Sequence, residues 1–385
     1  MRITHVVDFF HTDLPYQEYH LALQQARAGH DVSVVSSTRR HGGLPAATAA
    51  AAAGQAQLDA AGVRLIRLPS RELGHDRVVL SGLGAALDEL DPDAVHCHHC
   101  FSPTTLLVAR WAHRRPVSLL CDSHLSAVNV PGATSGAGRT FYRAWRTIVG
   151  PWLRRRVGAF VVNGSPEHAF LAEHLGLTQA RVETIPLGFD PTTYAWDPAR
   201  RRAVRATWGV ADDEVVVALT GKHTVDRRTD RRVAAAARLA ERQPTRVVVA
   251  GSVGPGVRES WASAAPTFVA DGLIQELGFL DASDLAGCFL ASDVVIYHLS
   301  TISAFEAAGT GLPLAVAEGE FARFAVGLGI GATEVDLERV DLAGLLVDHG
   351  VREQRARDAL DIVGWPVLAA RFVDRYRSIP PRGRS

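Results

Sequence analysis

Short runs rich in Val, Ile and Leu alternate along the chain with longer segments of helical periodicity. The first run, residues 3–9, precedes a helical pattern over 16–30 that stops at Gly29, a residue typical of helix C-termini. Continuous apolar runs, rather than strict alternation of apolar and polar residues, indicate strands covered on both faces, as in parallel sheets. Further strand-like runs of this first series lie at 31–37, 63–69, 94–99, 117–123 and 159–165.

A second series of the same kind starts after residue 194. Residues 229–243 have helical periodicity between two of its strands, and the strand-like runs lie at 214–221, 245–252, 273–280, 292–298 and 312–318. Two successive series predict an α/β protein with two doubly wound, Rossmann-like domains facing a cleft. In such sheets, ligands bind beyond the carboxyl ends of the strands.

Length and charge narrow the class of protein. A chain of 385 residues is long enough for two domains, and its 41 acidic and 41 basic side chains balance. A nucleic-acid-binding protein would normally carry a basic excess, so no nucleic-acid partner is expected. The first residues lack the apolar core and cleavage site of a signal peptide, and no apolar stretch is long enough to span a membrane. We therefore expect a cytoplasmic protein.

Cysteine and histidine cluster in two short segments, HCHHC at 96–100 and CDSH at 121–124. The Cys-x2-Cys and Cys-x2-His spacings also occur in zinc sites. Both segments end apolar runs that read as buried strands, however, and a strand sends alternate side chains to opposite faces, which disfavours a tetrahedral site. The pattern favours small buried cysteines beside a polar site, and no metal is expected.

Residues 220–232, TGKHTVDRRTDRR, contain the only lysine of the chain, Lys222. One interpretation is chance in an arginine-rich composition. The other is that the basic residues hold phosphate, because a basic helix N-terminus opposes the helix dipole and calls for an anionic partner. The chain has neither a Gly-x-Gly-x-x-Gly dinucleotide motif nor a Gly-x4-Gly-Lys-Ser/Thr phosphate loop, which disfavours hydride transfer and P-loop chemistry.

Several segments, in order and almost from end to end, resemble the retaining GT-B glycosyltransferases of family 4. Residues 11–37 are similar to the opening loop, helix and strand of that family, 91–99 to its PDVVHxH strand, and 185–194 to its interdomain IPNGVD segment. The runs 247–252, 278–316 and 364–379 complete the match. The resemblance implies an N-terminal acceptor-side domain over 1–190, a C-terminal sugar-nucleotide-binding domain over 191–365, and a final helix over 366–385 that returns to the first domain.

The resemblance also implies a role for the lone lysine. In the family, the first strand of the C-terminal domain ends in a glycine and a basic residue, with a second basic residue about six positions later. Gly221, Lys222 and Arg228 stand at these positions. Two fixed cations would stabilise the charge that develops on a leaving nucleoside diphosphate without any metal. Arg231 and Arg232, which follow, are expected to be solvated.

A second part of the expected donor site lies in residues 297–313, YHLSTISAFEAAGTGLP. Thr301 can cap a short helix that runs through Glu306, and a helix N-terminus at the end of a strand is a natural phosphate cradle. The family carries Glu-x7-Glu here, and its second glutamate, which binds the ribose hydroxyls, corresponds to Glu306. His298 replaces the first glutamate, so the contacts with the donor sugar depart from the family pattern. The backbone amides around Ser300 and Ile302 belong to this cradle, and Gly278 and Phe279 are also expected to contact the donor.

Three positions of the N-terminal half complete the expected site. His124 follows a strand where the family has a histidine that contacts the transferred sugar, although a buried histidine satisfied by the backbone is the alternative. His98 follows the preceding strand and is expected to shape the acceptor side. Tyr16 and Gln17 lie at the place of the family's glycine-rich loop near the phosphates, but the usual glycine pair is absent.

The segment 139–158 is helical, basic and aromatic. It could lie on an anionic membrane, as in family members with lipid acceptors, or precede the next strand with Trp145 and Trp152 in the core. We favour the core interpretation, because Pro151 interrupts any long amphipathic face.

Together these observations predict a retaining glycosyltransferase that moves a sugar from a nucleoside diphosphate donor to a small-molecule, glycan or lipid-linked hydroxyl acceptor. A phosphorylase-like GT-B enzyme would need a lysine for pyridoxal phosphate, whereas the only lysine is already placed at the diphosphate, so no cofactor is expected. The remaining alternative, motivated by His298 and the missing glycine pair, is a sugar-nucleotide-binding protein with impaired catalysis.

Overall fold

The computed structural model describes residues 1–41, 50–73, 77–127, 130, 135–299 and 301–380. The chain divides into two compact units, one formed by Met1–Pro186 with Leu368–Ser385 and the other by Leu187–Val367. These boundaries lie within a few residues of those that the sequence suggests. Each unit is described by itself below.

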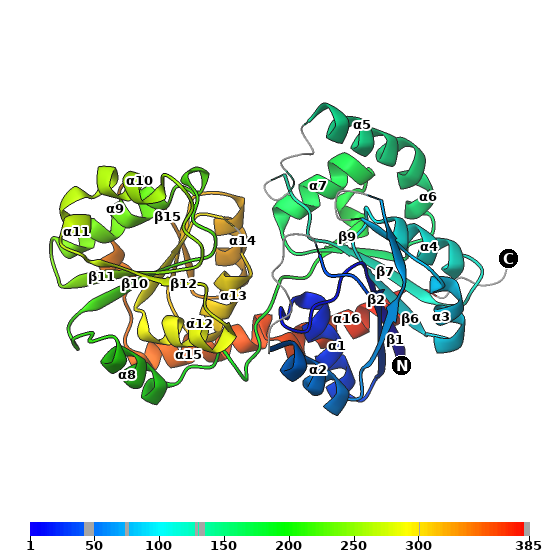
Figure 1. The fold of residues 1–385 in the computed structure, drawn as a ribbon, viewed down its shortest axis with the longest axis horizontal. Coiled ribbons are helices and arrows are strands. Elements are labelled where there is room, and N and C mark those ends of the chain that lie inside the picture. The colour runs from blue at the N-terminus through cyan, green and yellow to red at the C-terminus, as the bar shows by residue number, and fades with distance from the viewer. Residues whose placement is uncertain (42–49, 74–76, 128–129, 131–134, 300, 381–385) are drawn as a thin grey trace. The chain divides into compact units, whose positions relative to one another are not determined.

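The first unit contains a seven-stranded parallel sheet in the order β3-β2-β1-β6-β7-β8-β9 and a separate antiparallel pair, β4-β5 (Figure 1). The strands are β1 Arg2–Val7, β2 Asp31–Ser37, β3 Arg64–Leu68, β4 Ser70–Glu72, β5 Val78–Leu80, β6 Ala94–His98, β7 Ser118–Ser123, β8 Ala159–Val162 and β9 Val182–Thr184. The helices are α1 Gln17–Arg27, α2 Ala50–Ala60, α3 Leu83–Leu90, α4 Pro103–Ala112, α5 Gly136–Ala144, α6 Gly150–Arg154, α7 Ser165–Leu175 and α16 Trp365–Ser378, with a short 3-10 helix at Gln179–Arg181.

The two faces of this sheet differ in polarity. One face packs against α3, α4, α6 and α7 in a core of aliphatic, aromatic and cysteine side chains. The other face, beneath α1 and α16, carries buried histidines. Because alternate residues of a strand point to opposite faces, each of the strands β1, β6 and β7 contributes to both environments.

The second unit contains a six-stranded parallel sheet in the order β12-β11-β10-β13-β14-β15. Its strands are β10 Val215–Thr220, β11 Thr245–Ala250, β12 Ile274–Gly278, β13 Val294–Tyr297, β14 Leu314–Ala317 and β15 Ala332–Val335. Its helices are α8 Pro198–Thr207, α9 Thr229–Ala240, α10 Val257–Ala264, α11 Pro266–Ala270, α12 Ala282–Ala291, α13 Ile302–Gly309, α14 Glu320–Leu328 and α15 His349–Val363, with 3-10 helices at Val225–Arg227 and Leu342–Leu345.

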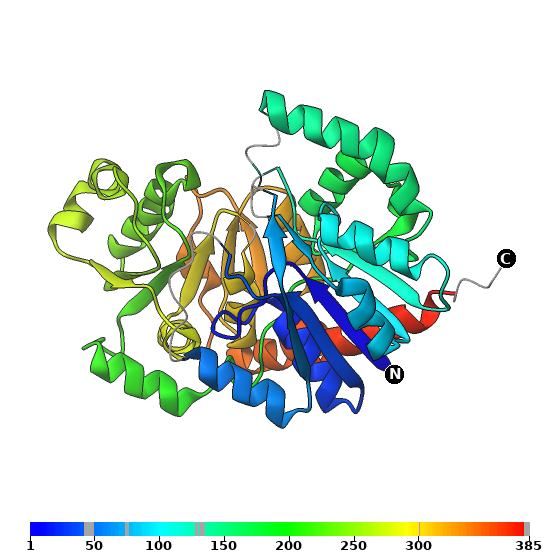
Figure 2. The same ribbon diagram turned by 45° about the vertical axis from the view of Figure 1, so that its right-hand side comes forward.

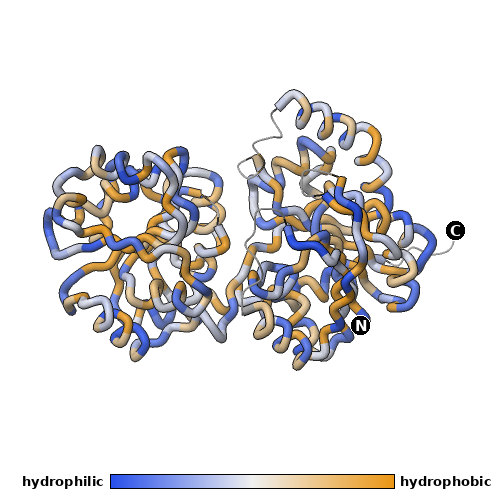
Figure 3. The backbone as a smooth tube through the Cα atoms, in the orientation of Figure 1, coloured by the Kyte–Doolittle hydropathy of each residue, from blue (hydrophilic) through white to orange (hydrophobic). Residues whose placement is uncertain are grey.

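Helices cover both faces of this second sheet, as Figure 2 shows. The core on one face includes residues of α12, α13, α14 and α15, and the core on the other includes residues of α9, α10 and α11. In Figure 3 the strands are coloured as hydrophobic, and the helices around them contain hydrophilic stretches. The strand order reverses between β10 and β13, and this switch point is where doubly wound sheets bind ligands.

The fold class predicted from the sequence is confirmed: both units are Rossmann-like α/β layers with parallel sheets. The predicted strand runs all contain strands. Three short elements were not predicted, namely β9, β15 and the β4-β5 pair. These strands are only three or four residues long, so they carry little periodic signal.

The basic and aromatic segment of the first unit is a helix interrupted by a π-helical turn at Trp145–Val149. Pro151 follows this turn and has no N–H to donate into the preceding ladder, which accounts for the irregularity. The Trp145 side chain is buried in the core and Trp152 is half-buried, whereas Ile148 is 74% exposed. No helix among the residues described is both long and apolar enough to cross a membrane.

Candidate active site

The lone lysine lies at the switch point of the second unit, immediately after β10. Gly221 has a φ of +103°, a backbone conformation that favours glycine, and it turns the chain away from the strand. Lys222 is exposed, and Arg228 precedes α9 with a φ of +50°. The Nε atom of Arg228 lies 3.7 Å from an oxygen of Asp230. The sequence therefore places two basic side chains at the carboxyl end of the central strand.

The first turn of α13 is tied to the ends of β10 and β13. Thr220 donates to the Tyr297 hydroxyl at 3.1 Å, and that hydroxyl donates to the Ser303 carbonyl at 2.8 Å. Thr301 is the N-cap residue, as predicted, but its hydroxyl contacts the Ser303 hydroxyl at 3.2 Å rather than a backbone N–H. Ile302 begins the helix. Ser300, the remaining predicted residue of this turn, lies outside the described residues.

Glu306 is the acidic group of this site. Burial raises the pKa of Glu306 to about 7, while a hydrogen bond with Tyr194 opposes that shift. At the end of β12, the edge strand that pairs with β11, Gly278 has a φ of +70°, and the residue that follows, Phe279, is 83% exposed. His298 is half-buried, and burial followed by the charges of Arg232, Arg228 and Arg231 lowers its pKa. At neutral pH His298 is therefore an uncharged imidazole.

The expectation that Arg232 is solvated is wrong. Its side chain lies in the first turn of α9 and the residue is only 3% exposed, whereas the side chain of Arg231 is 42% exposed and pairs with Glu338 at 3.1 Å. One position along an α-helix rotates a side chain by about 100°. That rotation turns Arg231 outward and Arg232 toward the sheet.

The first unit holds a cluster of polar side chains on one face of its sheet. Strand register accounts for it, because His5 pairs with His96 across β1 and β6, and His98 pairs with Asp122 across β6 and β7. Paired residues of parallel strands share a face. All four side chains therefore lie under α1 and α16.

Asp122 is the centre of this cluster. Its Oδ2 atom is 2.9 Å from His98 Nδ1 and 3.1 Å from His96 Nε2. The Gln17 amide donates to the same oxygen at 2.9 Å. His5 extends the network through a 2.9 Å contact between its Nδ1 and His98 Nε2. Gln25 of α1 and Tyr376 of α16 complete it.

Electrostatics keep one negative charge inside this network. Although burial opposes the charge, His98, His124 and His96 hold the pKa of Asp122 well below its usual range. Burial and His98 lower the pKa of His96 to about 4, and burial holds the pKa of His5 well below its usual range. The cluster therefore contains a buried carboxylate, and the neutral imidazole of His96 donates a hydrogen bond to it.

His124 lies at the edge of the cluster, and its side chain is 37% exposed. Its Nε2 is 3.6 Å from Asp122, and its Nδ1 contacts the Asn163 amide. Burial opposes the charged imidazole, yet the Asp122 carboxylate outweighs burial and raises the pKa of His124. Of the histidines in this cluster, His124 is the one that combines exposure with a raised pKa.

The other predicted residues of the first unit have different surroundings. His98 is only 7% exposed and is held between Asp122 and His5. Gln17 is also buried, with its amide nitrogen engaged by Asp122 and its Oε1 without a hydrogen bond. Tyr16 is 45% exposed. The roles predicted for these residues in donor and acceptor binding stay predictions.

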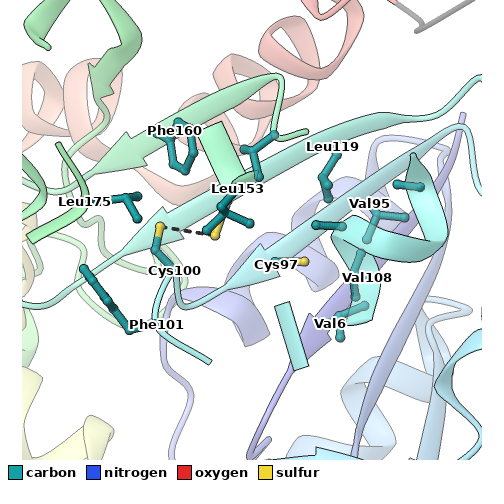
Figure 4. Packing of buried hydrophobic residues seen from close by; sticks show 14 of the residues in the cluster. Val6, Val95, Cys97, Cys100, Phe101, Val108, Leu119, Leu153, Phe160 and Leu175 are labelled. Atoms are coloured by element: carbon teal, nitrogen blue, oxygen red, sulfur yellow. Dashed lines mark hydrogen bonds between the residues drawn. The ribbon is translucent and has the colours of Figure 1, made fainter. Parts of the chain in front are cut away.

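Cys97 and Cys121 lie on the opposite face of β6 and β7, and Cys100 follows β6; Figure 4 shows Cys97 and Cys100 among the apolar side chains of the core. Cys97 and Cys121 are register partners within the apolar core, and the Cys121 and Cys100 sulfurs are 3.2 Å apart. Burial raises the pKa of all three thiols. Strand alternation thus separates cysteines from histidines and splits the apparent zinc pattern.

Among the residues that the structure describes, two groups of side chains bring potential metal-ligand atoms within 4.8 Å of one another, namely His5, His96 and His98, and His98, Asp122 and His124. Hydrogen bonds within the cluster account for both arrangements. In addition, the His96 and His98 rings are stacked with centroids 4.1 Å apart. Stacked rings direct their nitrogen lone pairs along their own planes rather than toward one shared ion. Metal independence stays a prediction.

Comparison with known proteins identifies the family. Residues 18–193 match the family model of Glycosyltransferase Family 4. Similar curated proteins are D-inositol 3-phosphate glycosyltransferases. The protein from Kribbella flavida is 28% identical over 308 residues, which cover 74% of this chain and 71% of that protein. The chain is a glycosyltransferase with the GT-B fold, and residues 18–193 match glycosyltransferase family 4.

The match to other curated relatives covers less of their length. The D-inositol 3-phosphate glycosyltransferase of Mycobacterium bovis is 30% identical over 280 residues, or 68% of this chain and 54% of that protein. Solved structures resemble this glycosyltransferase over nearly its whole length. A glycosyltransferase from Rickettsia africae has a TM-score of 0.69 at 13% identity, with 99% of each chain covered. Anabaena HepE, solved with UDP and glucose, has a TM-score of 0.65 at 15% identity and covers 98% of this chain and 99% of its own.

Sequence reasoning on this glycosyltransferase missed Asp122 and Arg232 as site residues. Asp122 stands inside the CDSH motif, and strand alternation alone would have placed it on the face opposite Cys121. Arg232 had a weaker signal, because its burial depends on the helix phase of α9, which adjacent basic residues obscure.

Proposed function

We propose that the protein is a retaining, metal-independent glycosyltransferase that transfers a sugar from a nucleoside diphosphate donor to a hydroxyl-bearing acceptor. The observation that carries the proposal is the grouping of Lys222, Arg228 and the first turn of α13 around the switch point between β10 and β13. Two cations and a helix N-terminus suit a diphosphate, whose negative charge increases as the glycosidic bond breaks.

Each residue then has a distinct task. Lys222 and Arg228 bind the diphosphate, and Glu306 accepts hydrogen bonds from the ribose hydroxyls. His124 contacts the transferred sugar. As the bond from the sugar to the diphosphate breaks, the acceptor oxygen attacks the same face of the sugar, and an oxygen of the leaving diphosphate takes the acceptor proton. This sequence retains the configuration of the sugar carbon and needs no metal.

Support for a sugar-nucleotide donor also comes from the fold relatives, since Anabaena HepE has been solved with UDP-glucose. For the acceptor, a pocket of about 320 Å³ lies in the first unit. Its lining includes Arg39, Arg40 and Arg67. We propose that the acceptor binds there and that D-inositol 3-phosphate, the compound named in the curated relatives, is the first acceptor to test.

The experiment is a thermal-shift screen with UDP, GDP, ADP and dTDP and their glucose or mannose derivatives, followed by transfer and donor-hydrolysis assays. The proposal expects one base to stabilise the protein, and NMR of the product to show an anomeric configuration equal to the donor's. EDTA should leave the rate unchanged. Binding without transfer or hydrolysis would favour the catalytically impaired sugar-nucleotide-binding protein. An inverted product or a rate lost on chelation and restored by zinc would refute the mechanism.

A further inference from the structure

Arg232 is a buried cation with incomplete pairing. Its Nη2 donates to the Thr229 hydroxyl at 2.9 Å, and its Nη1 reaches the Ile296 carbonyl at a long 3.4 Å. Its Nε is buried without a hydrogen-bond partner. It forms no ion pair with any residue that the structure describes. A buried charge in this state is costly unless a partner neutralises it.

The other buried arginines of the second unit show how such a charge is usually accommodated. Arg201 and Arg205 both pair with Asp293, at 2.5 Å and 3.1 Å. Arg352 donates through all three of its guanidinium nitrogens to backbone carbonyls. Of the four, Arg232 is the one with a buried nitrogen atom that lacks a partner. Arg232 therefore has a hydrogen-bond donor available in the first turn of α9.

The surroundings of Arg232 contain further unpaired polar atoms. His298 follows the strand whose Ile296 carbonyl Arg232 contacts, and its Nδ1 is buried without a partner. The Nδ1 of His223 is in the same condition. After burial, the charge of Arg232 contributes most to the lowered pKa of His298, so the two side chains interact electrostatically. Unpaired buried groups beyond the ends of two neighbouring strands, β10 and β13, are candidate contacts for a ligand.

Charge decides what kind of ligand group fits there. The diphosphate is matched by Lys222 and Arg228, so Arg232 is a cation in excess. The resemblance places a glutamate at position 298 in the family, whereas a neutral imidazole stands there in this chain. The exchange removes the protein's own acid at the place where Arg232 is buried.

We propose that the donor sugar carries a carboxylate, as in a uronic acid, and that Arg232 binds this carboxylate with His298 as a second hydrogen-bond donor. The proposal rests on the proposed function of the same site and adds the class of sugar. A guanidinium recognises a carboxylate through two parallel N–H donors, and the unpartnered Nε with a neighbouring Nη offers such a pair. The carboxylate would supply the acid that the chain itself lacks.

The test compares matched donors that differ only at the sugar. Once the screen has identified the base, isothermal titration measures the free nucleoside diphosphate, its glucose derivative and its glucuronate derivative. We expect the glucuronate donor to bind the unaltered protein at least about tenfold more tightly than the glucose donor. Arg232→Leu should abolish this preference while leaving the affinity for the nucleoside diphosphate within about twofold.

Arg231→Leu is the matched control, because the neighbouring residue has the same charge but is half-exposed and paired with Glu338. It should leave the preference intact. Thermal unfolding of both variants checks the fold, and Arg232→Lys, which keeps the charge, provides a second variant if the leucine variant does not fold. His298→Glu should restore an acid beside Arg232 and shift the preference toward the glucose donor.

The outcomes separate the two proposals. If no nucleoside diphosphate binds, the proposed function itself fails. If nucleotides bind but the glucuronate donor gains nothing over the glucose donor, only the carboxylate proposal is overturned. If Arg232→Leu weakens the free diphosphate as strongly as it weakens the glucuronate donor, Arg232 is a third phosphate ligand, and the carboxylate proposal is wrong.

Discussion

The two units of this glycosyltransferase contain buried charge in opposite states. In the first unit, one carboxylate, Asp122, accepts hydrogen bonds from histidines on two strands and from a glutamine of α1. In the second unit, one cation, Arg232, is buried with an unpartnered nitrogen and forms no ion pair with a described residue. The Oδ2 atom of Asp122 thus has several hydrogen-bond partners, although its Oδ1 atom has none. Several donors around one oxygen hold a carboxylate in place, whereas a buried cation with few partners is a candidate contact for an anionic ligand.

The largest expected effect is on the free energy of unfolding and concerns the hydrogen-bonded cluster around Asp122. Asp122→Ala leaves the buried imidazoles of His96 and His98 without their acceptor, and we expect a loss of about 3 kcal/mol or more in the free energy of unfolding. The measurement is urea denaturation at pH 7. Asp93→Ala is the control, because the side chain of Asp93 is 44% exposed and its pairing with Arg2 is worth at most about 1 kcal/mol. Similar losses in both variants would contradict the central role of Asp122.

The contribution of Asp122 to the free energy of unfolding also depends on pH. The folded-state pKa of Asp122 lies well below its usual range, so the stabilisation is present above the ordinary pKa of an aspartate and is lost as the pH falls through the folded-state value. In Asp122→Asn, the pKa of His124 should fall, since burial then acts without the opposing carboxylate. NMR titration of the His124 ring protons measures it.

His124→Ala should affect turnover rather than affinity. The proposed contact of His124 is to the sugar, whereas the groups proposed to bind the nucleotide lie in the second unit. We expect the rate per bound donor to fall about a hundredfold, the scale of one lost transition-state contact, with less than a twofold change in diphosphate affinity. Single-turnover kinetics and titration separate the two quantities. Lost binding with an unchanged rate would show that the assignment is wrong.

In the second unit, Lys222→Ala and Arg228→Ala should each weaken diphosphate binding by about 1.5–3 kcal/mol, the scale of a hydrogen bond to a charged group. Titration with the free nucleoside diphosphate measures the loss, and thermal unfolding checks the fold. Arg227→Ala, one position before Arg228, is the neighbouring control and should bind almost normally. Unchanged affinity in both Lys222→Ala and Arg228→Ala would eliminate the phosphate site.

The smallest effect is a pH dependence that comes from Glu306. Its pKa of about 7 in the free protein means that roughly half of the side chains are protonated at neutral pH. Only the carboxylate accepts hydrogen bonds from both ribose hydroxyls, so donor affinity should rise about tenfold between pH 6 and pH 8. A nucleoside diphosphate sugar is the suitable probe, because its phosphates do not titrate in this range.

Glu306→Gln is the control for this dependence and should bind every donor more weakly, with a nearly flat pH profile. The raised pKa has the opposite consequence for the fold. The folded protein retains a proton that the unfolded chain has released, so the free protein should lose stability as the pH rises from about 4.5 to about 7. A profile of donor affinity that stays the same in Glu306→Gln would assign the titration to another group.

Local patterns in the sequence were sufficient for much of this description. The alternation of apolar runs and helical segments specified the two α/β series, because strand and helix periodicities act over a few neighbouring residues. The positions of Gly221, Lys222 and Arg228 after a buried strand followed from the same local pattern. The start of α13 at Ile302 was predicted from Thr301, because capping is also a local property.

Tertiary structure decided which polar side chains meet and which are buried. His5, His98 and Asp122 are joined by strand register over separations of 93 and 24 residues, and no local pattern encodes such pairings. Arg231 and Arg232 are adjacent arginines, yet the packing of α9 against the sheet exposes Arg231 and buries Arg232. The sequence by itself determined the elements and the order of the basic residues. The assembled sheet brings distant strand ends together and fixes the phase of each helix. These two effects decided which charges are paired and left one nitrogen of Arg232 without a partner.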